Sequence, residues 1–419
     1  MEKQLSLNLL LLDDNEEDIE ALTECIEENS IQNLKVFIAK SAEEAIEYLD
    51  DYLYHIVSLD QRIPMNLNGI LSDENLTPVL EKYNISQPIS DGIVFTGYRN
   101  LLPGIKATKS KLEYIEKGVY SEKEWIEILL KLIKTTLKRS LKKDKLESLP
   151  FLFIKFINTI KYESEPWLKI TAWKDLYEVV LKLYTMVFAA ICQNESQLKA
   201  FSKKIIINLY NSRMYNNDWQ TALQKLFSLV IDKNHFFNQR YVHEINKYLV
   251  NGSGNFINTI NSLRVFRNEE FAHTMLKNKD SYKKVFNSMN FHFLSLIESC
   301  YMFSQNPLLD YIEPKISPNE YNEYFAKDFR GSQLNPRKIP FTSSIKFSSS
   351  EMHWCINGFN NIIEETIPLS PFIFSRFDED DVVRIYYLKD FNHFLYKDFL
   401  SNKEIHVPFT DSYISSYIK

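Results

Sequence analysis

The sequence predicts a multidomain protein in which a doubly wound α/β domain precedes an all-helical bundle and a small C-terminal β or α+β module. Short apolar runs between residues 7 and 116 each end beside a polar side chain, as strands of an open parallel sheet do. Between residues 151 and 310, apolar residues recur every three or four positions, which indicates helices. From about residue 330, short β-favouring runs alternate with clusters of Pro, Asn, Asp and Ser, which indicates strands and turns.

Four apolar runs of the α/β domain end beside side chains that can carry chemistry. In chain order these are the carboxylates of Asp13, Asp14 and Asp60, the hydroxyl of Thr96 and the ammonium of Lys117. The C-terminal ends of parallel strands lie along one edge of a sheet, so we expect these groups to meet at one site.

Clustered carboxylates repel one another unless a divalent cation lies between them, and Mg²⁺ prefers such oxygen ligands. The pattern therefore predicts Mg²⁺ as a cofactor beside Asp60. With the cation in place, the Asp60 carboxylate can act as a nucleophile and accept a phosphoryl group. A hydroxyl and an ammonium then complement the charge on the new phosphoryl oxygens. The alternative is that each acid is a solvated loop residue, which for any single acid is the commoner case.

Residues 5–135 resemble the receiver domain of two-component response regulators through the segments LLLLDDN, SLDQRIP, IVFTGY and IEKG. The resemblance implies a flavodoxin-like fold and phosphorylation by a histidine kinase. The chain departs from the family pattern after Pro64, where residues 69–91 are longer than usual, and at Gly118, where the family usually has proline. The residues that the resemblance implies are a metal site of Asp13, Asp14 and Asp60, phosphorylation on Asp60, and a switch through Thr96 and Lys117.

Composition limits the class of protein further. A chain of 419 residues is long enough for two or three domains, and 45% hydrophobic with 25% charged residues describes a globular chain. The net charge of −6 argues against a protein that coats nucleic acid or an anionic membrane without specificity. The four cysteines form no CxxC pair, so neither a zinc site nor a disulfide framework is expected. No signal peptide and no apolar stretch of roughly 20 residues is seen, so we expect a cytoplasmic protein.

A helix is predicted over residues 121–146, with one apolar face and a second face rich in Lys and Arg. We interpret it as a solvated connector, and the alternative is a basic face that steers RNA. The dense aromatic residues of the following helices are interpreted as core. The predicted domains are the receiver-like domain 1–135, a connector and linker 136–165, the helical domain 166–310, and a β-rich module 330–419 of unknown role.

One stretch of the helical domain, residues 260–273, holds Arg267, Asn268 and His273. An imidazole can exchange a proton with a ribose hydroxyl or a leaving oxygen, and a guanidinium can bind the scissile phosphate through two hydrogen bonds. The amide of Asn268 can orient the imidazole. On an unbroken helix Arg267 and His273 would point about 120° apart. A shared pocket therefore requires a break near Glu270 or two copies that face each other.

Residues 165–305 resemble the HEPN superfamily through the segment RNEEFAH, in which an Arg and a polar residue precede a His. The resemblance implies a helical homodimer whose composite ribonuclease site (Arg267, Asn268 and His273) needs no metal or cofactor. It also implies RNA as the substrate and suggests a role in toxin or antiphage defence. The predicted function is accordingly a ribonuclease that a phosphorylated receiver domain controls.

A non-catalytic signalling adaptor is the alternative. Its helical domain would dimerise or bind a protein partner under receiver control, Arg267 would pair with Glu270 or Asp280, and His273 would cap a helix. A regulator that binds DNA is disfavoured, because the sequence shows no helix-turn-helix pattern and its net charge is acidic. We expect no membrane partner.

Overall fold

The computed structural model of the chain describes residues 7–28, 34–87, 91–96, 112–116, 124, 127–132, 148–233, 239–251, 255–268, 279–314, 322–331, 336–343, 345, 347, 352–357, 362–377, 383–390, 395–401 and 403–407. The chain forms two compact units. Unit 1 comprises Met1–Lys145 with Ile245–Phe256, and unit 2 comprises Leu146–Glu244 with Ile257–Lys419. Among the described helices, none has both the length and the apolar character that a membrane span requires.

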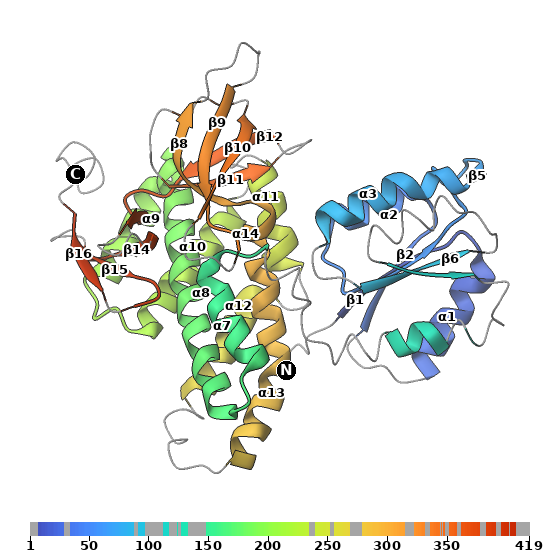
Figure 1. Ribbon diagram of the computed structural model, residues 1–419, viewed down its shortest axis with the longest axis horizontal. Helices are drawn as coiled ribbons and strands as arrows, with labels where there is room; N and C mark the ends of the chain where they lie inside the picture. The colour runs from blue at the N-terminus through green and yellow to red at the C-terminus, as the bar shows by residue number, and fades with distance from the viewer. Residues whose placement is uncertain are drawn as a thin grey trace. The chain divides into compact units, whose positions relative to one another are not determined.

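A five-stranded parallel sheet forms the centre of unit 1 (Figure 1). Its spatial order is β2-β1-β3-β6-β7, and every pairing is parallel. This is the flavodoxin-like order, in which the winding reverses between β1 and β3 and ligands bind beyond the C-terminal strand ends. The predicted doubly wound fold of this domain is confirmed. The strands are β1 (Leu7–Leu12), β2 (Leu34–Ala39), β3 (Ile56–Asp60), β6 (Asp91–Thr96) and β7 (Glu113–Glu116).

Helices cover both faces of this sheet. Helix α1 (Glu16–Glu28) lies on one face, and α2 (Ala42–Asp51) and α3 (Leu76–Ser86) lie on the other (Figure 1). Residues 127–132 are helical, and Leu129 and Leu130 are buried in the same apolar cluster as the inward side of α1. This part of the predicted connector helix is therefore core of the α/β unit, because its apolar face packs on the sheet. Apart from residue 124, the rest of 121–146 lies outside the described residues.

The close approach of β3 and β6 requires glycine at position 92. A Cβ atom there would lie 2.3 Å from Val57 Cγ2 and 2.6 Å from the Val57 carbonyl oxygen. Val57 is fully buried, so neither atom can move away cheaply. We expect Gly92→Ala to lower the free energy of unfolding of unit 1 by about 1–3 kcal/mol, measured by urea denaturation. Glu47→Ala, at an exposed position of α2, is the control. Equal stability of the Gly92 variant and wild type would contradict the close contact with Val57.

The helical part of unit 2 is built around α8 (Pro166–Asn194), which contacts α7, α9, α10 and α13. Most side chains of α8 are buried, among them Trp173, Tyr177, Tyr184 and Phe188, which confirms these aromatic residues as core. Trp167 differs, with 51% of its surface exposed. The other helices are α7 (Phe151–Tyr162), α9 (Ser196–Tyr210), α10 (Asn216–Asp232), α11 (Gln239–Ile245), α12 (Phe256–Phe266), α13 (Lys279–Cys300) and α14 (Met302–Gln305). The π-helical turn that follows α11 (Asn246–Val250) belongs to unit 1.

Two predicted domain boundaries differ in the structure, although the helix over residues 151–162 was itself expected. Helix α7 lies inside the predicted linker 136–165, and its apolar residues are buried core. The β-rich part begins at Leu308 instead of near residue 330. The first strand, Leu308–Pro314, begins at the end of the predicted helical domain and continues into residues 311–329, which the predicted domains left unassigned. One β-favouring run of the C-terminal part, residues 345–347, is not a strand at its two described positions, although Phe347 packs in the adjoining core.

The β-rich part contains a closed barrel and a separate sheet. The barrel order is β10-β12-β11-β8-β9, in which β8, β9 and β10 form an antiparallel meander and β10 pairs with β12 in parallel. This is the connectivity of a five-stranded Greek-key barrel of the OB type. The barrel strands are β8 (Leu308–Pro314), β9 (Asn322–Asp328), β10 (Arg337–Ser343), β11 (His353–Asn357) and β12 (Ile362–Pro368). The four-stranded antiparallel sheet comprises β13 (Ile373–Phe377), β14 (Val383–Asp390), β15 (Leu395–Asp398) and β16 (Glu404–His406).

His353 is a structural histidine of the barrel. Thr366 Oγ1 lies 2.8 Å from its Nδ1, and Nε2 is buried without a hydrogen-bond partner among the described residues. Burial lowers the pKa of the His353 imidazole from 6.5 to about 4. The unfolded chain therefore binds an extra proton between about pH 4 and pH 6.5. The contribution of the neutral imidazole to stability is complete above pH 6.5 and is lost as the pH falls towards 4.

We expect the folded protein to lose about 3 kcal/mol of stability through His353 between pH 7 and pH 4. The variant His353→Gln lacks the titrating group, so the stability difference between wild type and variant should shrink as the pH falls. Urea unfolding at several pH values measures it, with the exposed His406→Gln as the control. A difference that stays constant with pH would show that His353 does not titrate in this way.

Candidate functional site

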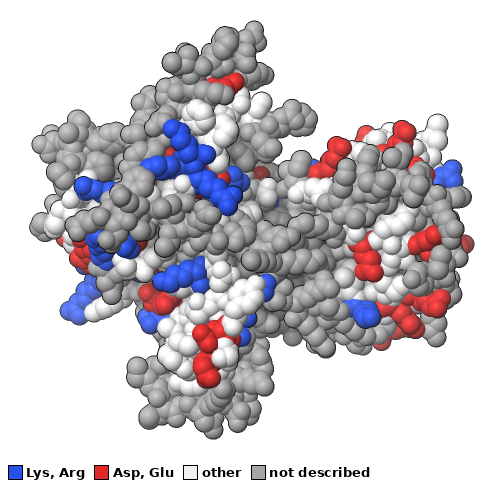
Figure 2. Space-filling view, in the orientation of Figure 1, with Lys and Arg blue, Asp and Glu red and all other residues white. Residues whose placement is uncertain are grey.

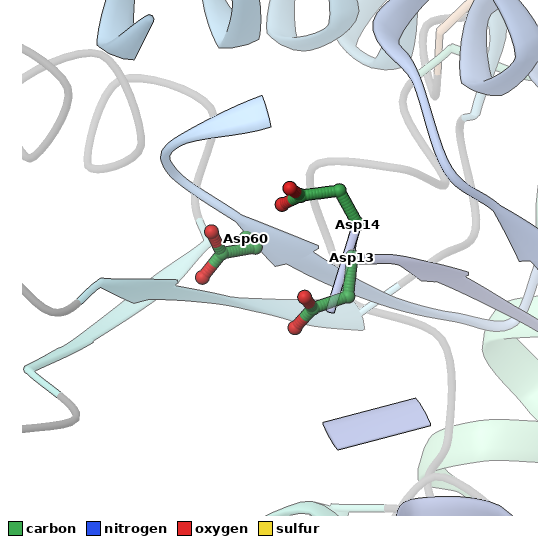
Figure 3. Close-up of side chains that lie close together, drawn as sticks. All are labelled: Asp13, Asp14 and Asp60. Atoms are coloured by element: carbon green, nitrogen blue, oxygen red, sulfur yellow. The ribbon is translucent and has the colours of Figure 1, made fainter. Parts of the chain in front are cut away.

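Asp13, Asp14 and Asp60 converge at the C-terminal ends of β1 and β3 (Figure 3). One carboxylate oxygen from each residue lies within 4.8 Å of the other two. Asp13 is buried, whereas Asp14 and Asp60 are partly exposed. The convergence follows from the strand order, because β1 and β3 are neighbours paired from Leu9 with Ile56 to Leu12 with Leu59. The structure thus brings together the three acids that the sequence placed at one site.

Local turns hold two of these carboxylates in place. The backbone N–H of Asn15 donates to Asp13 Oδ1 at 3.0 Å, and the backbone N–H of Arg62 donates to Asp60 Oδ2 at 3.1 Å. Each acid is thus bonded to the amide two residues further on, the turn that an aspartate favours just after a strand. These turns fix the side chains at the sheet edge, where the chain leaves each strand.

The donor set fits Mg²⁺. Ligand oxygens about 2.1 Å from an octahedral Mg²⁺ ion lie about 3–4 Å apart, so small side-chain rotations bring oxygens within 4.8 Å of one another into range. Three carboxylates offer the hard oxygen ligands that this ion prefers, and their mutual repulsion favours a cation between them. The partial exposure of Asp14 and Asp60 leaves room for water and a phosphoryl donor on the open side.

Thr96 is the last residue of β6, and β7 ends at Glu116, one position before Lys117. Thr96 pairs with Glu116, and its neighbour Phe95 pairs with Asp60, so the backbone of Thr96 lies at the same sheet edge as the acids. The side chain of Thr96 and the whole of Lys117 lie outside the described residues. The predicted role of Thr96 and Lys117 as a switch therefore stays a prediction.

Gln61 is a residue of this edge that the sequence analysis did not single out. It is fully buried directly after Asp60, and its backbone N–H donates to the Phe95 carbonyl oxygen at 2.8 Å. The hydroxyl of Tyr114 on β7 donates to Gln61 Oε1 at 2.8 Å. Gln61 thereby links the end of β3 to the strand that precedes Lys117. In the sequence, Gln61 shows itself as a polar residue that follows an apolar strand, and many loops begin with the same pattern.

In unit 2, Arg267 lies directly after α12 and belongs to a polar cluster with residues of α8 and α10. We call it the Arg267 cluster (Arg267, Glu178, Lys182 and Asn216). Arg267 Nη2 lies 3.6 Å from Glu178 Oε1, with 30% and 25% of the two side chains exposed. Asn216 Nδ2 donates to the same Glu178 oxygen at 2.8 Å, and Lys182 Nζ lies 3.8 Å from Glu178 Oε2. Arg267 Nε is buried without a hydrogen-bond partner among the described residues. The described partner of Arg267 is thus Glu178, which is distant in sequence.

Burial changes the protonation of groups in and beside this cluster. It lowers the pKa of the Lys182 ammonium, and the nearby Glu178 carboxylate opposes that change. Burial also raises the pKa of the Asp175 carboxyl and that of the Tyr177 hydroxyl. Asn268 is exposed next to Arg267, whereas His273 lies outside the described residues, as does Glu270. Of the predicted catalytic residues, the structure therefore describes Arg267 and Asn268, and it does not describe His273.

Known structures are similar to part of the chain. No protein-family model and no curated protein match the sequence. A CheY-like receiver domain protein from Methanospirillum hungatei is 19% identical, covering 32% of this chain and 99% of its own, with a TM-score of 0.27. The response regulator domain of Thermotoga maritima CheB is 22% identical, covering 32% and 98%, with a TM-score of 0.25. A Burkholderia pseudomallei response regulator with a phosphorylated aspartic acid, calcium ion and citrate is 19% identical, covering 33% and 69%, with a TM-score of 0.24.

Proposed function

We propose that this chain is a response-regulator effector whose unit 1 is phosphorylated on Asp60 by a histidine kinase. The convergence of Asp13, Asp14 and Asp60 at the switch edge of a flavodoxin-like sheet carries this proposal. Bound Mg²⁺ supplies positive charge that neutralises the phosphate of the donor. A carboxylate oxygen of Asp60 attacks the donor phosphorus, the bond from phosphorus to the leaving nitrogen breaks, and an aspartyl phosphate forms.

The proposed switch involves Thr96 and Lys117. A hydroxyl at the end of β6 and an ammonium just beyond β7 can each bond a phosphoryl oxygen on Asp60 and so report the phosphorylated state. The neighbouring strand ends, with Asp60 opposite Phe95 and Thr96 opposite Glu116, support this role. The test of the phosphorylation site is transfer from acetyl phosphate to wild type and to the Asp60→Asn variant, followed by intact mass.

For unit 2 we propose a HEPN-like ribonuclease activity in which Arg267, Asn268 and His273 act on RNA, with a homodimer as the working form and defence as its context. Two features of the described residues support it. The contact of Arg267 with Glu178, at 3.6 Å, is longer than a hydrogen bond, so a phosphate oxygen can replace the carboxylate. Asn268 is exposed beside it and can reach a bound substrate. The imidazole of His273 would then transfer the proton without a metal.

A non-catalytic adaptor is the second candidate, and the pairing of Arg267 with Glu178 favours it. An arginine with an internal carboxylate partner has a structural role that needs no substrate. In this case unit 1 would control dimerisation or the binding of a protein to unit 2. The variant His273→Ala separates the two candidates, because it removes an activity only if that activity depends on the imidazole.

A further inference from the structure

Strands β9 and β10 of the barrel present an outer face that the proposed phosphorylation and cleavage chemistry do not use. Along β9 the side chains alternate, so that Tyr324 and Ala326 are buried in the barrel while Phe325 and Lys327 are partly exposed on the outside. This alternation follows from the two-residue repeat of a strand whose one side is core. A partly exposed aromatic ring therefore lies two residues from a lysine on the same surface.

Strand β10 continues this surface. Lys338 and Pro340 are exposed, and the antiparallel register places Lys338 opposite Lys327 and Pro340 opposite Phe325. The Lys338 ammonium lies 5.0 Å from the centroid of the Phe325 ring, so cation and ring form one contact patch. We call the set of Phe325, Lys327, Lys338 and Pro340 the β9–β10 face.

The charge on this face is mostly positive although the whole chain carries −6. Arg337 is exposed at the start of β10, next to Lys338. Among the described residues of the two strands, the acid on the outer surface is Glu323, and it lies towards the far end of β9 from Lys327. Asp328 is buried and pairs with Arg330 at 2.6 Å. Figure 2 shows Lys and Arg side chains gathered over β8 and β9.

We infer that the β9–β10 face binds single-stranded RNA. Lysine and arginine side chains attract the phosphates of a backbone, and a partly exposed phenylalanine ring offers a surface on which an unpaired base can stack. In a duplex the bases are already stacked on one another, so the ring favours a single strand. This binding goes beyond the proposed function and does not require that unit 2 cleave RNA.

The test measures binding of the full-length His273→Ala protein to a fluorescent 12-nucleotide oligouridine by anisotropy at several salt concentrations. We expect binding that weakens steeply with salt. The double variant Lys327→Glu, Lys338→Glu should weaken it at least about tenfold, and Phe325→Ala should weaken it about 5- to 100-fold. Phe325→Tyr keeps the ring and should bind like the parent protein. Lys204→Glu, at an exposed position of α9, is the charge-matched control.

Circular dichroism of each variant verifies that the fold is intact. The inference is overturned if the parent protein does not bind the oligouridine, which would leave this face to a protein partner. It is also overturned if the β9–β10 variants bind as well as Lys204→Glu, or if a 12-base-pair RNA duplex or an oligothymidine of equal length binds more tightly. Binding by the parent protein, together with no RNA cleavage by wild type, would instead count against the ribonuclease proposal alone.

Discussion

Replacing Asp60 with asparagine is expected to abolish phosphoryl transfer to the protein, because an amide lacks the nucleophilic carboxylate oxygen. Wild type incubated with acetyl phosphate and Mg²⁺ should gain a phosphoryl group in its intact mass, and Asp60→Asn should gain none. Asn has the same size and can keep the contact with the Arg62 amide that Asp60 makes at 3.1 Å, so the turn should persist. The loss can then be assigned to chemistry.

Two further variants make this experiment specific. Asp14→Asn retains the nucleophile and removes one charged ligand, so labelling should continue but require more Mg²⁺. Glu17→Gln removes an exposed carboxylate from the first turn of α1 and should label like wild type. EDTA should stop labelling of wild type. A label that persists in Asp60→Asn would place the acceptor elsewhere and refute the site assignment.

The second large effect is expected in RNA cleavage. If unit 2 is a ribonuclease of the proposed kind, His273→Ala and Arg267→Ala should each lower the cleavage rate at least about 100-fold. Proton transfer by a positioned imidazole is worth that much, and so is stabilisation of the developing phosphate charge by a positioned donor. Gel electrophoresis of a labelled RNA measures the rate. EDTA should spare cleavage by protein that is already activated, and loss of cleavage on chelation would indicate a metal-dependent catalyst.

Matched controls separate catalysis from folding and charge. Arg264→Ala removes an exposed arginine of α12, three residues before Arg267, and His406→Ala removes an exposed histidine of β16. Both should cleave like wild type. Equal loss of activity in Arg264→Ala and Arg267→Ala would attribute the effect to charge in general. Dimer content, measured by light scattering, should stay the same in all of these variants.

The acid cluster was predictable from the sequence because each of its acids lies at the end of an apolar run, a pattern that can be seen without knowing any long-range contact. Each strand of the parallel sheet is an apolar run, and the residues that end or directly follow the strands all lie along one edge of the sheet. Asp13, Asp14 and Asp60 could therefore be placed together before any contact between them was known. The same reasoning placed the backbone of Thr96. Helices α8 and α10 were predictable from the three- and four-residue spacing of apolar residues.

Contacts between distant parts of the chain were not predictable in this way. In the adaptor alternative Arg267 was expected to pair with Glu270 or Asp280, both close in sequence. It lies beside Glu178 of α8 instead, next to the contact between the Phe266 and Trp173 rings. The contact between Gln61 and Tyr114 likewise depends on strand order. The barrel was read as unspecified β structure, since its closure depends on the parallel pairing of β10 with β12, which no local pattern encodes.

The central claim is that phosphorylation of unit 1 controls an activity of unit 2. It is tested most directly by RNA cleavage with purified wild type and His273→Ala, each with and without Mg²⁺ and beryllofluoride, which mimics the aspartyl phosphate. We expect cleavage that requires His273 and changes on addition of beryllofluoride. Absence of cleavage in every state, with beryllofluoride still altering the oligomeric state, would contradict the ribonuclease and favour the adaptor.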